Sequence, residues 1–216
     1  MSRLNDIAAA GKVIPVLSYK NSEEAVATSR TLYSAGIRVF EITLRHETAL
    51  DAIRAVVADL PGDAFVGAGT VMTPALVDAA IDAGACFGVS PGLTATLAGY
   101  VQQKTCVKQK KWGFLPGIAS LSEAMTAAEQ GFDMLKFFPA EASGGVSFLK
   151  AAGSVLPAVH FCPTGGLTPA RAPDYLALAN VPVVGGSWLV VREADGSVDQ
   201  QATYTAAAAA AKIQAA

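Results

Sequence analysis

The chain has 216 residues, and its 16 Lys and Arg residues against 18 Asp and Glu residues give a formal net charge of -2. This balance argues against partners of large negative charge, so we expect neither nucleic acid nor an anionic membrane surface to bind. Hydrophobic residues make up 52% of the chain and charged residues only 16%. The low charged share predicts a fully buried sheet and suggests that an oligomer partner covers part of the surface.

Metal-binding residues are scarce. The three cysteines are Cys86, Cys106 and Cys162, and the two histidines are His46 and His160. No cysteine pair has zinc-like spacing, and two histidines are too few for a His-rich metal site. The sequence therefore argues against a zinc-dependent enzyme and most hydrolases, and we expect no metal and no cofactor.

We expect a cytoplasmic protein with neither a membrane span nor a secretory signal. No apolar run reaches the roughly 18 residues that cross a bilayer. Asp6 interrupts the short apolar stretch near the start, which is unlike a signal peptide. The cysteines fit reduced thiols of that compartment.

Short apolar runs rich in β-branched and aromatic residues recur along the chain and are expected to be strands. In chain order they are Val13–Leu17, Val39–Leu44, Phe65–Gly69, Phe87–Ser90, Phe114–Pro116, Met134–Phe138, His160–Thr164 and Val183–Gly186. Helical patterns lie between them, at Ser22–Ala35, Ala49–Asp59, Pro74–Ala83, Ser122–Gln130, Val146–Ser154 and Pro169–Leu178. The alternation predicts a parallel sheet, and eight strands predict an α/β fold of the (β/α)8 TIM-barrel type.

A single domain is expected over residues 1–216, because no linker interrupts this alternation. An N-terminal segment precedes the first strand. The Ala-rich stretch Gln200–Ala216 favours a terminal helix that packs on the barrel. In such barrels the chemistry lies at the C-terminal ends of the strands, so candidate functional residues are sought there.

Lys136 lies in an apolar run, Met134-Leu135-Lys136-Phe137-Phe138. A charged ammonium is costly to place in a packed interior, so burial favours the neutral amine. A neutral amine is the nucleophile that forms a Schiff base with a ketone or aldehyde. Alternatively, the lysine head reaches solvent at the strand end and has no chemical role.

Glu41 is the expected partner of Lys136. Side chains alternate faces along a strand, so Glu41, Thr43 and Arg45 share one face of the second predicted strand. The same alternation places Lys136 on the face of Phe138. If both faces point into the barrel, Glu41 and Lys136 can exchange protons as general acid/base and nucleophile. A buried ion pair without chemistry is the alternative.

Candidate ligand-binding residues follow other strand ends. Arg45 suits a small carboxylate because a guanidinium donates two parallel hydrogen bonds, with a surface ion pair as the alternative. Thr70 follows a Gly67-Ala68-Gly69 turn that lets the backbone approach a ligand, with a plain turn role as the alternative. The double glycine Gly165-Gly166 follows the seventh predicted strand and Gly185-Gly186 ends the eighth, where barrels of this class bind phosphate.

These residues closely resemble the family of 2-keto-3-deoxy-6-phosphogluconate (KDPG) aldolase, which is grouped with 4-hydroxy-2-oxoglutarate (KHG) aldolase. The matching segments run in order from the second to the eighth predicted strand and span nearly the whole chain. They are Phe40–Arg45, Gly67–Val71, Ser90–Thr94, Leu135–Glu141, Phe161–Gly166 and Gly185–Leu189. Each segment is short, but their joint occurrence is highly specific.

The resemblance implies a metal-independent Schiff-base aldolase in a (β/α)8 barrel, assembled as a homotrimer and acting on a phosphorylated 2-keto acid in the Entner–Doudoroff pathway. It implies that Lys136 is the Schiff-base lysine and Glu41 the general acid/base. The other implied roles are a pyruvate-carboxylate site at Arg45 and Thr70, a pocket wall at Pro91 and Thr164, and a phosphate end at Gly165, Gly166, Gly186 and Ser187. The expected reaction is reversible cleavage of KDPG to pyruvate and glyceraldehyde 3-phosphate.

Three other functions stay open. A sibling aldolase would use the same lysine on KHG, giving pyruvate and glyoxylate, or on the galactose-series epimer of KDPG. A phosphosugar isomerase or epimerase would have no covalent step. A barrel that only binds phosphorylated sugars would have no use for Glu41 and Lys136 together.

Two segments depart from the family pattern. Residues 104–113 carry Lys104, Lys108, Lys110, Lys111 and, next to them, Trp112, where the family has a shorter link. We expect a solvated loop at the N-terminal end of the barrel, which affects stability more than activity. In the first strand's exit, Ser18 stands where some relatives have an arginine, so Lys20 is either a substitute phosphate contact or a solvated side chain.

Overall fold

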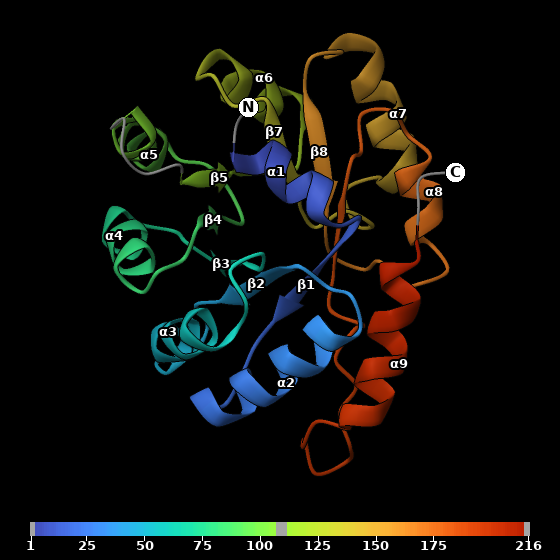
Figure 1. Cartoon of the computed structure of the whole chain (residues 1–216). Helices are drawn as coiled ribbons and strands as arrows, with labels where there is room; N and C mark the ends of the chain where they lie inside the picture. The colour runs from blue at the N-terminus through green and yellow to red at the C-terminus, as the bar shows by residue number, and fades with distance from the viewer. Residues whose placement is uncertain (1–2, 107–111, 214–216) are drawn as a thin grey trace.

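Strands and helices alternate along the computed structural model, which describes residues 3–106 and 112–213 (Figure 1). The strands are β1 (Val13–Leu17), β2 (Val39–Thr43), β3 (Phe65–Gly69), β4 (Phe87–Val89), β5 (Gly113–Leu115), β6 (Gly117–Ile118), β7 (Met134–Phe137), β8 (His160–Pro163) and β9 (Val184–Gly186). The helices are α1 (Arg3–Ala10), α2 (Ser22–Ser34), α3 (Ala49–Asp59), α4 (Pro74–Asp82), α5 (Ala95–Cys106), α6 (Leu121–Glu129), α7 (Gly145–Val155), α8 (Ala172–Leu176) and α9 (Gln200–Ala211). Within these two ranges, none of the helices has the length and apolar character that a bilayer crossing requires.

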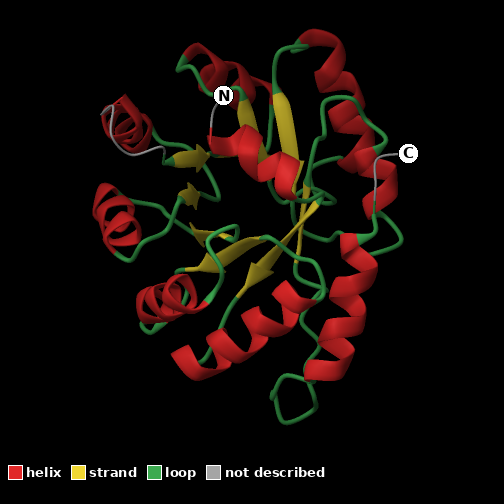
Figure 2. Ribbon diagram, in the orientation of Figure 1, coloured by secondary structure: helices red, strands yellow, loops and turns green. Residues whose placement is uncertain are grey.

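The strands form a curled parallel arrangement with helices outside it (Figure 2). One sheet has the order β5-β4-β3-β2-β1-β9 and a second has the order β6-β7-β8. Every pairing within the sheets is parallel. An isolated parallel bridge between Thr164 and Gly185 links the end of β8 to β9. Parallel neighbours need a crossover, and the helices supply it.

The fifth predicted strand is divided in two. Instead of one strand over Phe114–Pro116, β5 pairs with β4 and β6 pairs with β7. Pro116 lies between them and has no N–H to donate to a ladder. Its carbonyl still accepts the N–H of Lys136 at 2.8 Å, so the two sheets remain in contact at this point.

Local signals explain the helix starts. The side chains of Asn21, Thr73 and Asp199 accept N–H groups from the first turns of α2, α4 and α9. For α6 the predicted start at Ser122 is late by one residue, because Ser120 is the cap and its hydroxyl accepts the N–H of Glu123. Five of the six predicted helices begin and end within two residues of the observed ones, whereas α8 is shorter than predicted.

Side chains of the strands pack in two directions. Those facing outward join the large core beneath the helices, with Phe40 and Ile42 of β2 almost completely buried there. Those facing inward form a smaller apolar cluster that includes Phe87 and Met134. Leu4 and Ile7 of α1 join this inner cluster, so the N-terminal helix seals one end of the strands with apolar side chains. The chemistry must then lie at the other end.

The basic segment differs in part from the expected solvated loop. Lys108, Lys110 and Lys111 lie outside the described residues. Lys104 belongs to α5, and its Nζ lies 2.6 Å from Asp78 Oδ1 on α4. The expectation of a solvated position is wrong for Trp112. Its side chain is buried and packs beside Phe114, with the ring centroids 5.7 Å apart. An indole ring has a large apolar area, and its burial is favourable. Tertiary packing therefore decides where Trp112 lies, despite the lysines next to it in the sequence.

Candidate active site

Lys136 and Glu41 meet in the interior, as strand alternation predicts. Lys136 Nζ donates a hydrogen bond to Glu41 Oε1 at 3.2 Å. Lys136 is 6% exposed and Glu41 is 3% exposed, so the pair is shielded from water and the lysine head does not reach bulk solvent. The Nζ atom also lies 5.3 Å from the ring centre of Phe138, within the range of a cation–π contact.

Glycines in β3 make room for this arrangement. A side chain at Gly69 would bring its Cβ to 2.4 Å from Glu41 Oε1, and one at Gly67 would meet the Phe87 ring at 2.3 Å. The predicted Gly67–Gly69 turn is in fact the last part of strand β3. These glycines therefore admit neighbouring side chains, and no ligand is needed to explain them.

A cavity of about 130 Å³ opens beside Lys136 at the C-terminal ends of the strands. Of the residues predicted for the site, its lining contains Arg45, Lys136, Thr164, Gly165, Gly166, Gly186 and Ser187. It also contains Val16, Phe138, Leu167 and Gly185, which sequence reasoning did not assign to the site. Phe138 could have been found, because alternation already places it on the face of Lys136.

Arg45 lies just beyond β2 and is exposed. Its guanidinium forms no ion pair or hydrogen bond with any residue in the described ranges. By contrast, Arg38 and Arg54, which are near it in the sequence, both form ion pairs. The surface ion pair considered for Arg45 is therefore not formed there. A free guanidinium at a cavity edge is available to an anionic ligand.

The Gly165-Gly166 turn also lines the cavity. Both residues have positive φ, +99° and +80°, a conformation that glycine adopts without a steric cost. The N–H groups of Gly165, Gly166, Leu167 and Ser187 donate no hydrogen bond to any of the described residues. Free backbone donors at a concave surface are suited to an anion.

Gly185 keeps β9 close to this turn. A side chain there would bring its Cβ to 2.3 Å from Thr164 Oγ1, so only a residue without one fits beside Thr164. Thr164 is buried, and its N–H donates to Phe137 at 2.9 Å. The last two strand ends are thereby joined at the cavity.

Thr70 and Pro91 do not belong to the lining of this cavity. Thr70 has a φ of 62°, which costs roughly 1–3 kcal/mol for a residue with a side chain and often marks a functional position. Pro91 packs against Gly117, where an added Cβ would come within 2.2 Å of its backbone carbon. Their expected roles toward a ligand stay predictions.

Cys162 lies opposite Lys136 in the β7–β8 register and is buried. Burial raises the pKa of its thiol to about 12, and the negative charge of Glu41 adds to the shift. A protonated thiol is a poor nucleophile and a poor metal ligand. Within the described ranges, His, Cys, Asp and Glu residues do not cluster in a way that would hold a metal ion.

Lys20 does not line the cavity. Its Nζ donates to the carbonyl of Gly196 at 3.2 Å, on the loop between β9 and α9. Arg192 from the same loop donates to the carbonyl of Ser18 at 3.0 Å. The first strand's exit is thus bound to this loop by two cations.

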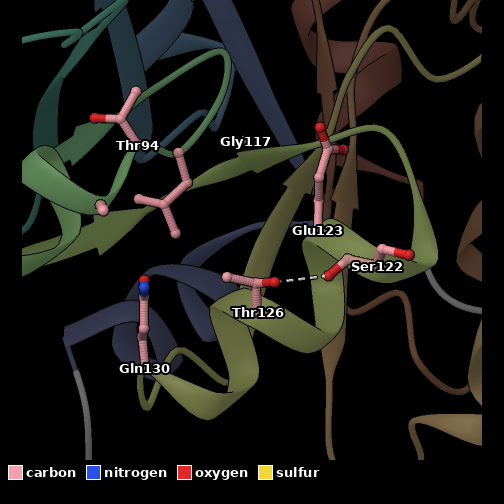
Figure 3. Close-up of a pocket in the computed structure, with 8 residues that line it drawn as sticks. Thr94, Gly117, Ser122, Glu123, Thr126 and Gln130 are labelled. Atoms are coloured by element: carbon pink, nitrogen blue, oxygen red, sulfur yellow. Dashed lines mark hydrogen bonds between the residues drawn. The ribbon is translucent and has the colours of Figure 1, made fainter.

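A second hollow, of about 220 Å³, lies between α5 and α6 (Figure 3). Thr94 lies on one side of it, and Glu123, Thr126 and Gln130 follow α6 on the other. It contains none of the residues predicted for the site. The cavity beside Lys136 is therefore the candidate active site.

The fold and the site together define a parallel α/β protein with a buried lysine–carboxylate pair beside a cavity at the strand ends. The family model of KDPG and KHG aldolase matches residues 4–204. The chain belongs to this aldolase family.

Individual relatives agree. The KHG/KDPG aldolase of Escherichia coli is 46% identical over 184 residues, which are 85% of this chain and 83% of the relative. The 2-dehydro-3-deoxy-phosphogluconate aldolase of Zymomonas mobilis is 43% identical over 190 residues, which are 88% of each chain.

Two solved structures are closely similar. The crystal structure of the Zymomonas mobilis KDPG aldolase with 3-phosphoglycerate has a TM-score of 0.90 and 37% identity, covering 99% of this chain and 97% of that one. The Legionella pneumophila KDPG aldolase, with pyruvate captured as a covalent carbinolamine intermediate, has a TM-score of 0.88 and 38% identity, covering 95% and 97%.

Proposed function

We propose that this chain is a class I aldolase that reversibly cleaves KDPG to pyruvate and glyceraldehyde 3-phosphate through a Schiff base on Lys136. The observation that carries the proposal is the buried Lys136–Glu41 contact of 3.2 Å beside a cavity whose lining includes the guanidinium of Arg45 and the Gly165-Gly166 turn. Aldol cleavage needs a nucleophilic amine, a proton acceptor next to it and anchors for a charged substrate. Family membership supports all three requirements.

In the proposed mechanism, neutral Lys136 attacks the C2 ketone of the substrate and forms a carbinolamine. Loss of water, with Glu41 moving the protons, gives the iminium. The iminium accepts the electron pair of the C3–C4 bond as Glu41 removes the C4 hydroxyl proton, and glyceraldehyde 3-phosphate leaves. The resulting enamine is protonated at C3, and hydrolysis of the iminium releases pyruvate and restores the amine.

The substrate carries two charged groups, a carboxylate and a phosphate, and each needs its own set of donors. We assign the pyruvate carboxylate to Arg45 and Thr70, with Pro91 and Thr164 against the carbon chain. The phosphate lies at Gly165, Gly166, Gly186 and Ser187, where free N–H groups provide support. The ligand of the Zymomonas mobilis structure, 3-phosphoglycerate, also carries a carboxylate and a phosphate. The carbinolamine of the Legionella pneumophila protein supports the amine chemistry.

Cleavage of KHG to pyruvate and glyoxylate is the second candidate. The Escherichia coli relative carries both names, KHG and KDPG aldolase. KHG has a second carboxylate in place of the phosphate, so the same glycine turns would bind an anion of different shape. The rates of cleavage of the two substrates distinguish the candidates.

Further proposals concern the whole molecule. We propose that the two sheets belong to one closed (β/α)8 barrel, in which β5 and β6 are a single strand interrupted at Pro116, and that residues 1–216 are one domain. The Thr164–Gly185 bridge and the contact of Pro116 with Lys136 support closure. We further propose a homotrimer in the cytoplasm, acting in the Entner–Doudoroff pathway. A sedimentation mass three times the 22.1 kDa of the chain would support the trimer.

The deciding experiment is borohydride reduction in the presence of pyruvate, followed by intact and peptide mass spectrometry. A pyruvyl adduct on Lys136 is the expected result. A well-folded protein without an adduct would contradict the mechanism and favour a phosphosugar isomerase or a binding barrel. Cleavage of KDPG, followed by pyruvate release, then tests the substrate.

A further inference from the structure

A polar cluster behind the Gly165-Gly166 turn takes no part in the proposed mechanism. Its hydroxyl donor is Tyr175 on α8, whose Oη donates to Glu141 Oε1 at 2.7 Å. Arg171, at the start of α8, places its Nε 3.6 Å from the same oxygen. Glu141 belongs to the segment after β7, so the cluster joins this segment to α8.

Glu141 is also in direct contact with the turn. Its backbone N–H donates to the carbonyl of Gly165 at 3.2 Å. A side chain at Gly166 would bring its Cβ to 2.8 Å from the Cβ of Glu141, so the two residues pack without space between them. A shift of the Glu141 side chain would therefore move the turn.

Charge excludes direct phosphate binding by Glu141. A carboxylate repels a phosphate group, and Arg171 offsets that charge only from a half-exposed position.

Tyr175 is fully buried, and its hydroxyl donates to the carboxylate of Glu141. Burial raises the pKa of Tyr175, and the bond to Glu141 adds to the shift, so the phenol is a neutral donor near pH 7. A buried hydroxyl without its acceptor is costly, and this cost fixes the carboxylate in place.

We propose that Glu141, held by Tyr175, is a positioning residue that fixes the Gly165-Gly166 turn so that its free N–H groups converge on the phosphate of the substrate. This inference rests on the proposed function, because it concerns the phosphate end of the same cavity. The role is geometric, so a neutral side chain with an acceptor oxygen at position 141 should also fill it.

Inorganic phosphate, used as a competitor of KDPG cleavage, tests the inference. Tyr175→Phe should raise the inhibition constant of phosphate roughly 3- to 10-fold, the effect of losing one hydrogen bond. The KM for KDPG should rise with little change in kcat. The rate of borohydride trapping of pyruvate on Lys136 should stay unchanged, because pyruvate has no phosphate. A general loss of structure would lower the trapping rate as well.

Substitutions of Glu141 provide a second test if Tyr175→Phe folds poorly. Glu141→Ala should weaken phosphate inhibition as Tyr175→Phe does. Glu141→Gln keeps an acceptor for the Tyr175 hydroxyl, so its phosphate inhibition should be as strong as in the unchanged protein. The matched control is Tyr33→Phe, which removes another tyrosine–carboxylate bond of 2.7 Å, to Asp63 before β3. Tyr33→Phe should leave phosphate inhibition unchanged.

The outcomes separate this inference from the proposed function. Phosphate inhibition of the same strength in the unchanged protein, Tyr175→Phe and Glu141→Ala would overturn the positioning role alone. A Glu141→Gln variant as defective as Glu141→Ala would also overturn it. If phosphate fails to inhibit the unchanged protein while KDPG is cleaved, the phosphate site itself is wrong, and the inference with it.

Discussion

At the scale of single residues, the chemistry depends on what surrounds Lys136 and Glu41. Each is nearly inaccessible to solvent, and each has the other as its charged neighbour. Removal of either charge leaves the other buried without a partner, which proteins tolerate poorly. Variants at these positions therefore need a binding or trapping measurement as well as an activity assay.

Lys136→Ala should abolish covalent trapping of pyruvate by borohydride, because no other amine lines the cavity in the described part of the chain. Intact mass spectrometry measures the adduct. Lys150→Ala, which removes an exposed lysine on α7, is the control and should still trap pyruvate. An adduct in the Lys136→Ala protein would remove Lys136 from the nucleophile's role.

Glu41→Gln should slow KDPG cleavage by about 10²–10⁴-fold, the usual contribution of a general acid/base, while some pyruvate is still trapped on Lys136. Steady-state pyruvate release measures the first effect and peptide mass spectrometry the second. The control is Glu47→Gln, which changes an exposed glutamate in the segment after β2. Its rate of KDPG cleavage should be close to that of the unchanged protein. Near-normal turnover of Glu41→Gln would contradict the assignment.

At the scale of elements, β3 determines whether Glu41 can reach Lys136. Glycine in a strand is normally unfavourable, because it loses more backbone freedom on folding and contributes no packing. Gly69 is compatible with β3 because the carboxylate of Glu41 occupies the space that a side chain would take. The glycine lowers the stability of β3, but it leaves room for Glu41 of the adjacent strand β2 to point inward.

Gly69→Ala should displace Glu41 and reduce turnover, with a loss of about 1–3 kcal/mol in the free energy of unfolding from overpacking. Gly99→Ala on α5 is the control, because among the described residues no atom outside the local helix backbone and the two chain neighbours lies within 4 Å of the added Cβ. That helix position should gain roughly 0.5–1 kcal/mol. Urea unfolding and pyruvate release measure both variants. Full activity in Gly69→Ala would mean that Glu41 adjusts without cost.

At the scale of the whole molecule, α1 and the inner apolar cluster seal one end of the strands and leave the polar chemistry at the other. The buried side chains between these ends include a titratable group that reports on folding. The pKa of Cys162 rises from its ordinary 9.0 to about 12, chiefly because burial excludes water. Stability should therefore depend on pH in the alkaline range.

The free energy of unfolding should fall as the pH rises above about 9. Between pH 9 and 12 the Cys162 thiol of the unfolded chain loses its proton, whereas that of the folded chain keeps it, so deprotonation favours unfolding. One such group contributes at most about 1.4 kcal/mol per pH unit. Urea unfolding at pH 8, 9 and 10 measures the slope. Cys162→Ala should have a shallower slope, and an equal slope would contradict the assignment.

Much of the fold and part of the site could be predicted from local patterns. The alternation of apolar strands and Ala-rich helices determines the parallel α/β arrangement, because each element must bury one face or both. Side-chain alternation along β2 and β7 was enough to predict that Glu41 and Lys136 share an interior, and the 3.2 Å contact confirms it. These features depend on periods of a few residues, which a sequence displays directly.

Other features required the tertiary structure. The interruption at Pro116, the burial of Trp112 and the packing of α1 against the strands each depend on neighbours far away in the chain. The contact of Glu141 with Gly166 and Tyr175 is of the same kind, because it joins residues from three separate segments. Local sequence determined which residues can form the elements and carry the chemistry. Only the folded chain decided which distant side chains touch, because long-range packing is set by the shape of the whole molecule.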